Sequence, residues 1–117
     1  MKRIPSGAGT KSLYEKGRRL VTSKWVFVYR ERSEDEDFRC AVHVGKRFGS
    51  AVERNRLRRQ VKEAVRSLGV EELSFELIIL PRMAVKGQKF REILGQLKIL
   101  LHRLRESKRE CSLFSAP

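Results

Sequence analysis

KRFGSAVERNRLRRQVKEAVRSLG, residues 46–69, joins a glycine-bounded loop to a strongly basic helical pattern. Ser50 and Glu53 have the spacing of a capping box, in which the Ser hydroxyl accepts the Glu53 amide and the carboxylate accepts the Ser50 amide. Gly69 can adopt a positive φ without a Cβ penalty, which suits the end of a helix. The stretch therefore predicts a helix that begins near Ala51 and stops at Gly69.

A helical projection at about 100° per residue separates this helix into two sides. One side is an apolar stripe of Leu57, Val61, Ala64, Val65 and Leu68, and the other side carries Asn55, Arg58, Arg59, Lys62 and Arg66. Arg56 falls on the flank, and Arg54 falls close to the apolar stripe. The helix is thus predicted to pack on a core and to present a basic outer face.

A run of charge on a helix is usually only a solvated face. Here, basic residues in the first two turns oppose the helix dipole, and Arg58 and Arg59 have few acidic neighbours with which to pair. The free amides and the dipole of a helix N-terminus also favour an anion. We therefore interpret this end of the helix as a place that receives phosphate.

The composition also indicates a polyanionic partner. The 117 residues suit one domain, and the net charge of +13 with a pI near 10.6 favours nucleic acid, with an anionic membrane as second choice. No apolar run approaches the roughly 20 residues of a membrane span, and no signal peptide follows Lys2 and Arg3, so we expect a cytoplasmic protein. Two cysteines, Cys40 in a strand pattern and Cys111 in a polar tail, suggest neither a disulfide framework nor a zinc site.

The remaining patterns predict a two-layer α+β domain. We expect a short helix at Lys11–Lys16, strands at Arg18–Thr22, Trp25–Arg30, Phe38–Val44 and Phe75–Leu80, a long helix at Lys86–Arg105, and flexible ends at 1–10 and 107–117. The two amphipathic helices should cover one face of a four-stranded sheet. The weak N-terminal helix is left for the other face, which predicts a groove there.

Catalytic chemistry is sparse in the sequence. His43 and His102 have no adjacent carboxylate or cysteine that would suggest a triad or a metal cluster, and Glu53 is engaged as a cap. We therefore predict no catalytic residue and no metal ligand in the protein. Tyr14 is the candidate ring for base stacking, whereas the aromatic residues of the strand at 25–30 fit the core better.

The segment GKRFGSAVERNRLRRQVKEAVR resembles the signature of the bacterial ribonuclease P protein subunit, whose core here is Arg54, Asn55 and Arg56. The resemblance extends from GRRLVTSKWVFVYRE through FELIILPR to the leucine-rich helix, and excludes the tail beyond about Ser107. It implies an αβββαβα sandwich with a left-handed βαβ crossover, as in the second domain of ribosomal protein S5. General rules of chain handedness disfavour such a crossover.

The resemblance also implies a function. The subunit would help a catalytic RNA remove the 5′ leader of precursor tRNA, with Mg²⁺ held mainly by the RNA and no stable protein partner required. The residues implied to bind the catalytic RNA are Lys46, Arg47, Arg54, Asn55, Arg56, Arg58, Arg59, Lys62 and Arg66. Those implied to bind the leader are Tyr14, Val28 and His43, although Thr10 and Val28 stand where the family often has aromatic residues.

Two other functions remain open from charge alone. A structural RNA-binding protein of the ribosomal type would carry a similar basic surface without any link to RNA processing. A nuclease that acts without RNA is the third possibility, and it requires catalytic groups that the sequence does not indicate.

Overall fold

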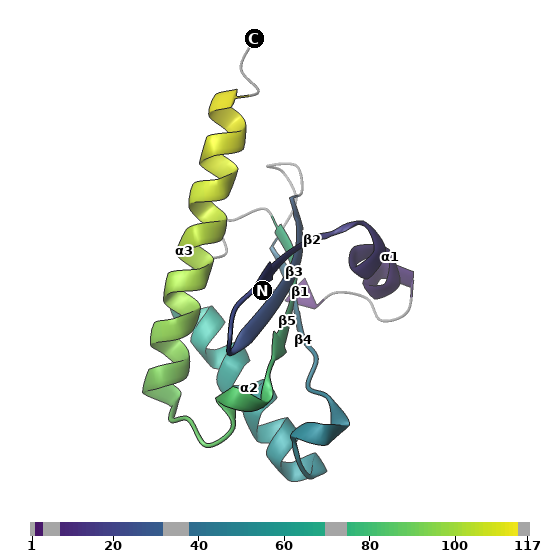
Figure 1. Cartoon of the computed structure of the whole chain (residues 1–117), viewed down its shortest axis with the longest axis vertical. Helices are drawn as coiled ribbons and strands as arrows, with labels where there is room; N and C mark the ends of the chain where they lie inside the picture. Colours follow the sequence, from purple (N-terminus) through teal and green to yellow (C-terminus); the bar gives the residue numbers. More distant parts are fainter. Residues whose placement is uncertain (1, 4–7, 32–37, 70–74, 115–117) are drawn as a thin grey trace.

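The computed structural model describes residues 2–3, 8–31, 38–69 and 75–114 (Figure 1). Its helices are α1 (Ala8–Lys16), α2 (Ala51–Ser67) and α3 (Phe90–Phe114), with short 3-10 turns η1 (Lys46–Phe48) and η3 (Met83–Val85). Its strands are β1 (Lys2–Arg3), β2 (Arg18–Val21), β3 (Trp25–Glu31), β4 (Arg39–Val42) and β5 (Phe75–Pro81). The predicted α+β class is confirmed.

The strands form one mixed sheet in the spatial order β1-β4-β5-β3-β2. β4 pairs parallel to β5 and to β1, whereas β3 pairs antiparallel to β5 and to β2. The four predicted strands are β2 to β5, and β1 adds a two-residue strand at the β4 edge. Two residues are too few to show a periodic pattern, which is why the sequence did not indicate β1.

Each face of the sheet has its own apolar cluster. Trp25 and Phe27 point from β3 into the large core under α2 and α3, and Val28 points to the opposite face, where it packs with Leu13 of α1 and Ile78 of β5. Figure 1 shows α1 on one side of the sheet and α3 on the other. Among the helices that the structure describes, α1 is the one on the second face, as predicted, and the aromatic residues at 25 and 27 belong to the core.

Helix α2 begins and ends as its sequence predicts. The Ser50 hydroxyl accepts the Glu53 amide at 3.2 Å, and the Glu53 carboxylate accepts the Ser50 amide at 3.4 Å. Gly69 has a φ of +64°, a conformation that favours glycine. Four residues of the predicted stripe, Leu57, Val61, Ala64 and Val65, are buried, and Leu68 packs against the same core.

Helix α3 is displaced from the predicted range. It starts at Phe90, after η3 and a turn at Gly87, whose φ is +85°. It continues to Phe114, beyond the predicted end at Arg105, so Cys111 lies in a helix. Residues 115–117 lie outside the described part of the chain, and the flexibility of 107–117 stays a prediction.

The N-terminal segment also contains more regular structure than its pattern indicated. The segment expected to be poorly ordered, residues 1–10, includes β1 and the first turn of α1. The predicted helix at Lys11–Lys16 therefore starts three residues earlier, at Ala8, and ends at the predicted Gly17.

Gly17 allows α1 to turn tightly into β2. Its amide donates to the Leu13 carbonyl at 2.7 Å, and a Cβ at this position would lie 2.5 Å from the same oxygen and 3.0 Å from the Tyr29 carbonyl oxygen. Both are backbone atoms, which cannot move aside as a flexible side chain would. Close approach of α1 to the sheet thus depends on the missing Cβ.

We predict that Gly17→Ala lowers the free energy of unfolding by about 1–3 kcal/mol, the usual cost of overpacking. Gly95→Ala is the matched control, because its Cβ would meet nothing within 4 Å in α3, so it should stabilise the protein by about 0.5–1 kcal/mol. Urea denaturation of both variants measures the difference. A Gly17→Ala variant as stable as the wild type would contradict the close packing of α1.

Candidate RNA interface

The predicted outward face of α2 is only partly exposed. Asn55, Arg56, Arg59 and Arg66 are exposed, as are Lys46 and Arg47 in the preceding η1 turn, while Arg54, Arg58 and Lys62 are half-buried. Among the residues that the structure describes, no ion pair is made by Arg54, Arg56, Arg58, Arg59 or Lys62. The positive charge of this face is therefore largely uncompensated within the protein.

Two acidic side chains on α2 do find cationic partners. Glu63 lies 3.5 Å from Arg66 in the next turn, and Glu53 lies 3.7 Å from Lys86, which follows η3. All four side chains are about half exposed or more, and such surface pairs contribute little stability. The cap hydrogen bonds from Ser50, followed by the charge of Lys86, lower the pKa of the Glu53 carboxyl.

One side of α2 runs beside strand β4. Arg54, Arg58 and Lys62 follow one another at four-residue intervals and so share this side. The charge of Arg58 acts on His43, just after β4, and the charge of Lys62 acts on Cys40 within it. The Nε of Arg54 is buried and, within the described residues, has no hydrogen-bond partner. This places Arg54 on the sheet side of the helix, as the projection indicated.

Tyr14 of α1 meets His43 across the second face of the sheet. The Tyr14 hydroxyl lies 2.8 Å from His43 Nδ1, and the ring centroids are 5.9 Å apart. Burial raises the pKa of the Tyr14 hydroxyl, and burial followed by the charge of Arg58 lowers the pKa of His43. Both shifts favour a Tyr14 hydroxyl that donates to Nδ1 of a neutral imidazole, which leaves the proton of the ring on Nε2.

The third predicted leader residue, Val28, occupies a different environment. It has no exposed surface and lies beneath α1 between Leu13 and Ile78. Arg19, its partner across β2 and β3, is exposed and acts electrostatically on Tyr14. The structure thus brings Tyr14 and His43 together at the rim of this face and puts Val28 in its floor.

A charged cluster on the same face was not indicated by any motif. Arg30 lies 2.6 Å from Glu76, Arg39 lies 4.0 Å from the same carboxylate, and the Ser12 hydroxyl accepts from Arg30 at 3.4 Å. Strand alternation could have found it, since Arg30 and Arg39 are on the same face of their strands as Val28 and His43. Through the Ser12 contact of Arg30, the cluster ties α1 to the sheet.

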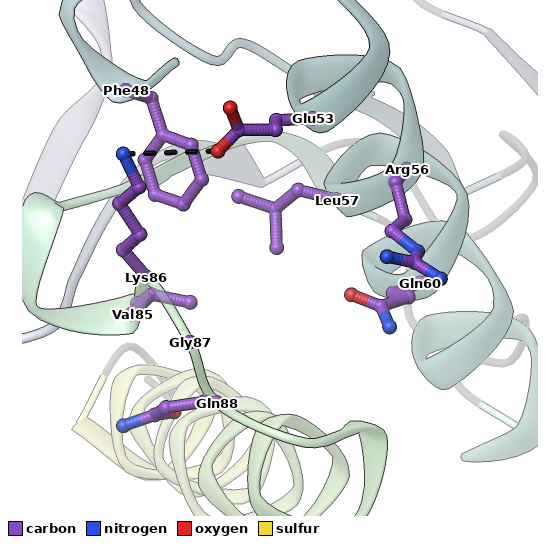
Figure 2. A pocket seen from close by; sticks show the side chains of 9 residues that line it. All are labelled: Phe48, Glu53, Arg56, Leu57, Gln60, Val85, Lys86, Gly87 and Gln88. Carbon is purple, nitrogen blue, oxygen red and sulfur yellow. Dashed lines mark ion pairs between the residues drawn. The ribbon is translucent and has the colours of Figure 1, made fainter. Parts of the chain in front are cut away.

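Two hollows lie along α2, on the side of the sheet opposite to α1. One, of about 370 Å³, separates α2 from the segment that enters α3 (Figure 2). It is lined by Phe48, Glu53, Arg56, Leu57, Gln60, Val85, Lys86, Gly87 and Gln88. The other, of about 450 Å³, is lined by Arg59, Gln60, Lys62, Glu63, Arg66 and Phe90. The residues at 85–90 are far from α2 in sequence, and no motif marked them.

The described residues offer neither a metal site nor a membrane span. These hold no group of three His, Cys, Asp or Glu side chains arranged to bind a metal ion, and no helix among them is long and apolar enough to cross a membrane. Burial raises the pKa of the Cys40 thiol to about 12, so this cysteine is protonated and unreactive near neutral pH.

Most of the chain matches a known protein family. The family model described as Ribonuclease P matches residues 2–105, which include every strand, α1, α2 and most of α3. The chain belongs to the bacterial ribonuclease P protein family. It is thus a subunit of the ribonuclease P holoenzyme, which acts in tRNA processing.

Individual relatives agree with this membership. The ribonuclease P protein component of Carboxydothermus hydrogenoformans is 36% identical over 100 residues, which cover 83% of this chain and 85% of the relative. That of Staphylococcus haemolyticus is 28% identical over 99 residues, which cover 85% and 86%.

Solved structures show the same fold. The RNase P protein from Thermotoga maritima has a TM-score of 0.78 and 26% identity, with 88% of this chain and 97% of that chain covered. A Staphylococcus aureus RNase P protein mutant with defective mRNA degradation activity has the same TM-score and identity, with 88% and 87% covered.

We predict that the imidazole of His43 titrates below the ordinary value of 6.5 and that Arg58→Ala raises its pKa, because one of the two causes of the shift is removed. In the unfolded chain the His43 imidazole has the ordinary pKa of 6.5, and in the folded protein its pKa is lower. Between these two pKa values the unfolded chain binds the proton more readily than the folded chain does. Folding stability should therefore fall as the pH drops through that window.

An NMR titration of the His43 ring in both proteins measures the shift. Arg66→Ala serves as the control, since it removes the same charge from the far end of α2 and should leave the His43 titration unchanged. A His43 pKa at or above 6.5 in the wild type would contradict the buried, Tyr14-bonded geometry.

Proposed function

We propose that this subunit binds the catalytic RNA of ribonuclease P through α2 and η1, and the single-stranded 5′ leader of precursor tRNA on the α1 face of the sheet. The RNA cleaves the leader, using Mg²⁺ that it holds mainly itself, and the protein supplies no catalytic group. The observation that carries the proposal is the uncompensated basic face of α2 in a member of this family.

The arrangement of cations supports the contact with catalytic RNA. The residues proposed to make it are Lys46, Arg47, Arg54, Asn55, Arg56, Arg58, Arg59, Lys62 and Arg66. They lie on one continuous segment that runs from η1 through four turns of α2. Apart from Arg66, which pairs with Glu63, the cations of α2 in this list have no acidic partner among the described residues, so they are available to neutralise phosphates and release the counterions of the RNA.

The Tyr14 and His43 pair supports the leader site. Aromatic and imidazole rings stack on unpaired bases without demanding a particular sequence, which suits a leader that differs among precursor tRNAs. Both rings are half-buried, so each keeps exposed surface for a ligand. Val28 would act as the floor that supports α1, and Arg19 would supply charge beside the rings.

Three further features belong to the proposal. We infer that the crossover from β4 through α2 to β5 is left-handed, as in the family, and a trace of the chain in an experimental density map would test this. We also expect the protein to work in the cytoplasm without a stable protein partner. The positive charge by itself would equally suit a ribosomal-type RNA-binding protein. Family membership favours ribonuclease P over this alternative.

We predict that the purified protein cleaves nothing alone and restores cleavage of precursor tRNA by its cognate RNA at low Mg²⁺. Tyr14→Ala should weaken the binding of a precursor with a leader of several nucleotides and leave a precursor with a one-nucleotide leader unaffected, because only the former reaches the α1 face. Single-turnover cleavage and equilibrium binding of both substrates provide the measurement.

Tyr14→Phe is the matched control, since it keeps the ring and removes only the hydroxyl bonded to His43. Cleavage by the protein without RNA would overturn the assignment of catalysis to the RNA. Equal losses with the long and short leaders would place Tyr14 outside the leader site while leaving the subunit's role intact.

The charge of α2 gives a separate prediction. Arg58→Ala with Arg59→Ala should reduce the slope of log K against log salt for catalytic-RNA binding by about 1.4–1.8, if each arginine meets one phosphate at roughly 0.7–0.9 per contact. Arg91→Ala with Lys98→Ala, which removes two exposed cations of α3, should change the slope little. Filter binding across a range of salt concentrations measures it, and an unchanged slope in the α2 variant would exclude these contacts.

A further inference from the structure

The hollow of about 370 Å³ beside α2 offers a polar rim rather than an apolar interior. Phe48, Leu57 and Val85 line it, but these side chains are almost fully buried and leave little surface for a ligand. Figure 2 shows Arg56 on the α2 side and Lys86 on the opposite side, in the segment that leads to α3. Contacts with a ligand would therefore come from the charged and polar groups at the rim.

The two hollows beside α2 adjoin each other. Gln60 lines both, and the segment 85–88, which lines the first hollow, continues to Phe90, which lines the second. Helix α2 thus forms one side of a continuous trough, and residues 85–90 form the other side. This second side lies between β5 and the body of α3, outside the basic motif of residues 46–69.

The trough carries a surplus of positive charge. Arg56 and Arg59 make no ion pair within the described part of the chain, and neither does Lys89, which is exposed just before Phe90. The charged side chains that line the two hollows are the cations Arg56, Arg59, Lys62, Arg66 and Lys86 and the carboxylates of Glu53 and Glu63. The trough would therefore attract a polyanion.

Lys86 is available for a second anion. Its ammonium lies 3.7 Å from a carboxylate oxygen of Glu53, and about half of each side chain is exposed. A surface pair of this kind contributes little stability. An ammonium group also has three N–H donors, so Lys86 can keep its contact with Glu53 and meet a phosphate as well.

The shape of the trough suits a strand of RNA. A groove with cations along it can follow the phosphates of a nucleic-acid backbone, which carries one negative charge at each nucleotide. An acidic protein segment would meet the same cations. However, α2 is already the proposed contact with the catalytic RNA, so this RNA would lie directly beside the trough.

We propose that a strand of the catalytic RNA lies along the trough, with its phosphates contacted by Lys86 and Lys89 on one side and by Arg56 and Arg59 on the other. The proposal rests on the proposed function. It deepens that function by extending the contact with catalytic RNA from α2 to residues 85–90, which are distant from the basic motif in sequence.

The salt dependence of binding between the full-length protein and its cognate catalytic RNA tests this contact. Lys86→Gln with Lys89→Gln should reduce the slope of log K against log salt by about 1.4–1.8, if each lysine meets one phosphate at roughly 0.7–0.9 per contact. Lys98→Gln with Arg103→Gln is the matched control, because it removes two exposed cations of α3 outside the trough and should leave the slope unchanged.

Urea denaturation should show that both double variants are folded under the binding conditions, since surface substitutions seldom alter stability much. If the variant with both lysines replaced is unfolded, the single variants take its place. Each of them should lower the slope by about half as much.

Hydroxyl-radical footprinting locates the contact on the RNA. The wild type should protect a run of consecutive nucleotides, and the variant with Lys86→Gln and Lys89→Gln should leave part of this run exposed. Arg56→Gln should expose nucleotides next to these on the same strand, because Arg56 lies across the trough. Exposure of nucleotides on separate strands by the two variants would contradict a single strand along the trough.

A charge-neutral change at Glu53 separates contact with RNA from support of the fold. Glu53→Gln retains a residue that can complete the capping box, and it removes the charge that pairs with Lys86. Binding should become tighter by roughly threefold, about the effect of one like charge removed at about 7 Å in water. Weaker binding by both Glu53→Gln and Lys86→Gln would instead assign Lys86 to the support of the helix cap and overturn the contact.

Failure of this proposal is distinguishable from failure of the proposed function. If Arg58→Ala with Arg59→Ala lowers the slope, while Lys86→Gln with Lys89→Gln changes neither slope nor footprint, the trough contact is excluded and the proposed function stands. The same result would be expected if an acidic protein segment occupied the trough. If the wild type itself fails to bind the catalytic RNA, the proposed function fails, and the trough contact fails with it.

Discussion

Four buried side chains of α2, Leu57, Val61, Ala64 and Val65, hold this helix against the large core and fix its rotation about its own axis. Full burial of one such Leu or Val is worth about 1.5–3 kcal/mol. Like charges four residues apart on a helix cost only about 0.2–0.5 kcal/mol per pair. Apolar burial therefore outweighs the repulsion among the arginines, and their charge stays available for the proposed contact with RNA.

The same rotation connects the two faces of the protein. Because Arg58 lies on the β4 side of α2, its charge reaches His43, which in turn is hydrogen-bonded to Tyr14 of α1. The basic helix and the α1 face are thus neighbours at the end of β4, where His43 lies, although α1 and α2 are far apart in sequence. An RNA bound on α2 and a leader bound beside Tyr14 would approach each other at this edge.

Local patterns explain how much of this was predictable. The capping box at Ser50 and Glu53, the stop at Gly69 and the apolar stripe of α2 depend on residues within one helix, so they were predicted and are confirmed. The start of α3 was misplaced because the turn around Gly87 carries no periodic signal. The short strand β1 was missed because its pairing partner, Arg39–Cys40, is distant in sequence.

The sequence by itself determined the four longer strands, the core-facing side of α2 and the family, because each of these rests on periodic or contiguous residues. Only the tertiary structure decided that Tyr14 bonds to His43, that Val28 lies in the floor, and that the segment 85–88 faces α2 across a hollow. Those contacts join residues that are far apart in sequence, whose meeting depends on how the helices pack on the sheet. The sequence of residues 46–69 therefore predicts which side of this helix faces the core, whereas the tertiary structure decides which other segments lie beside the helix.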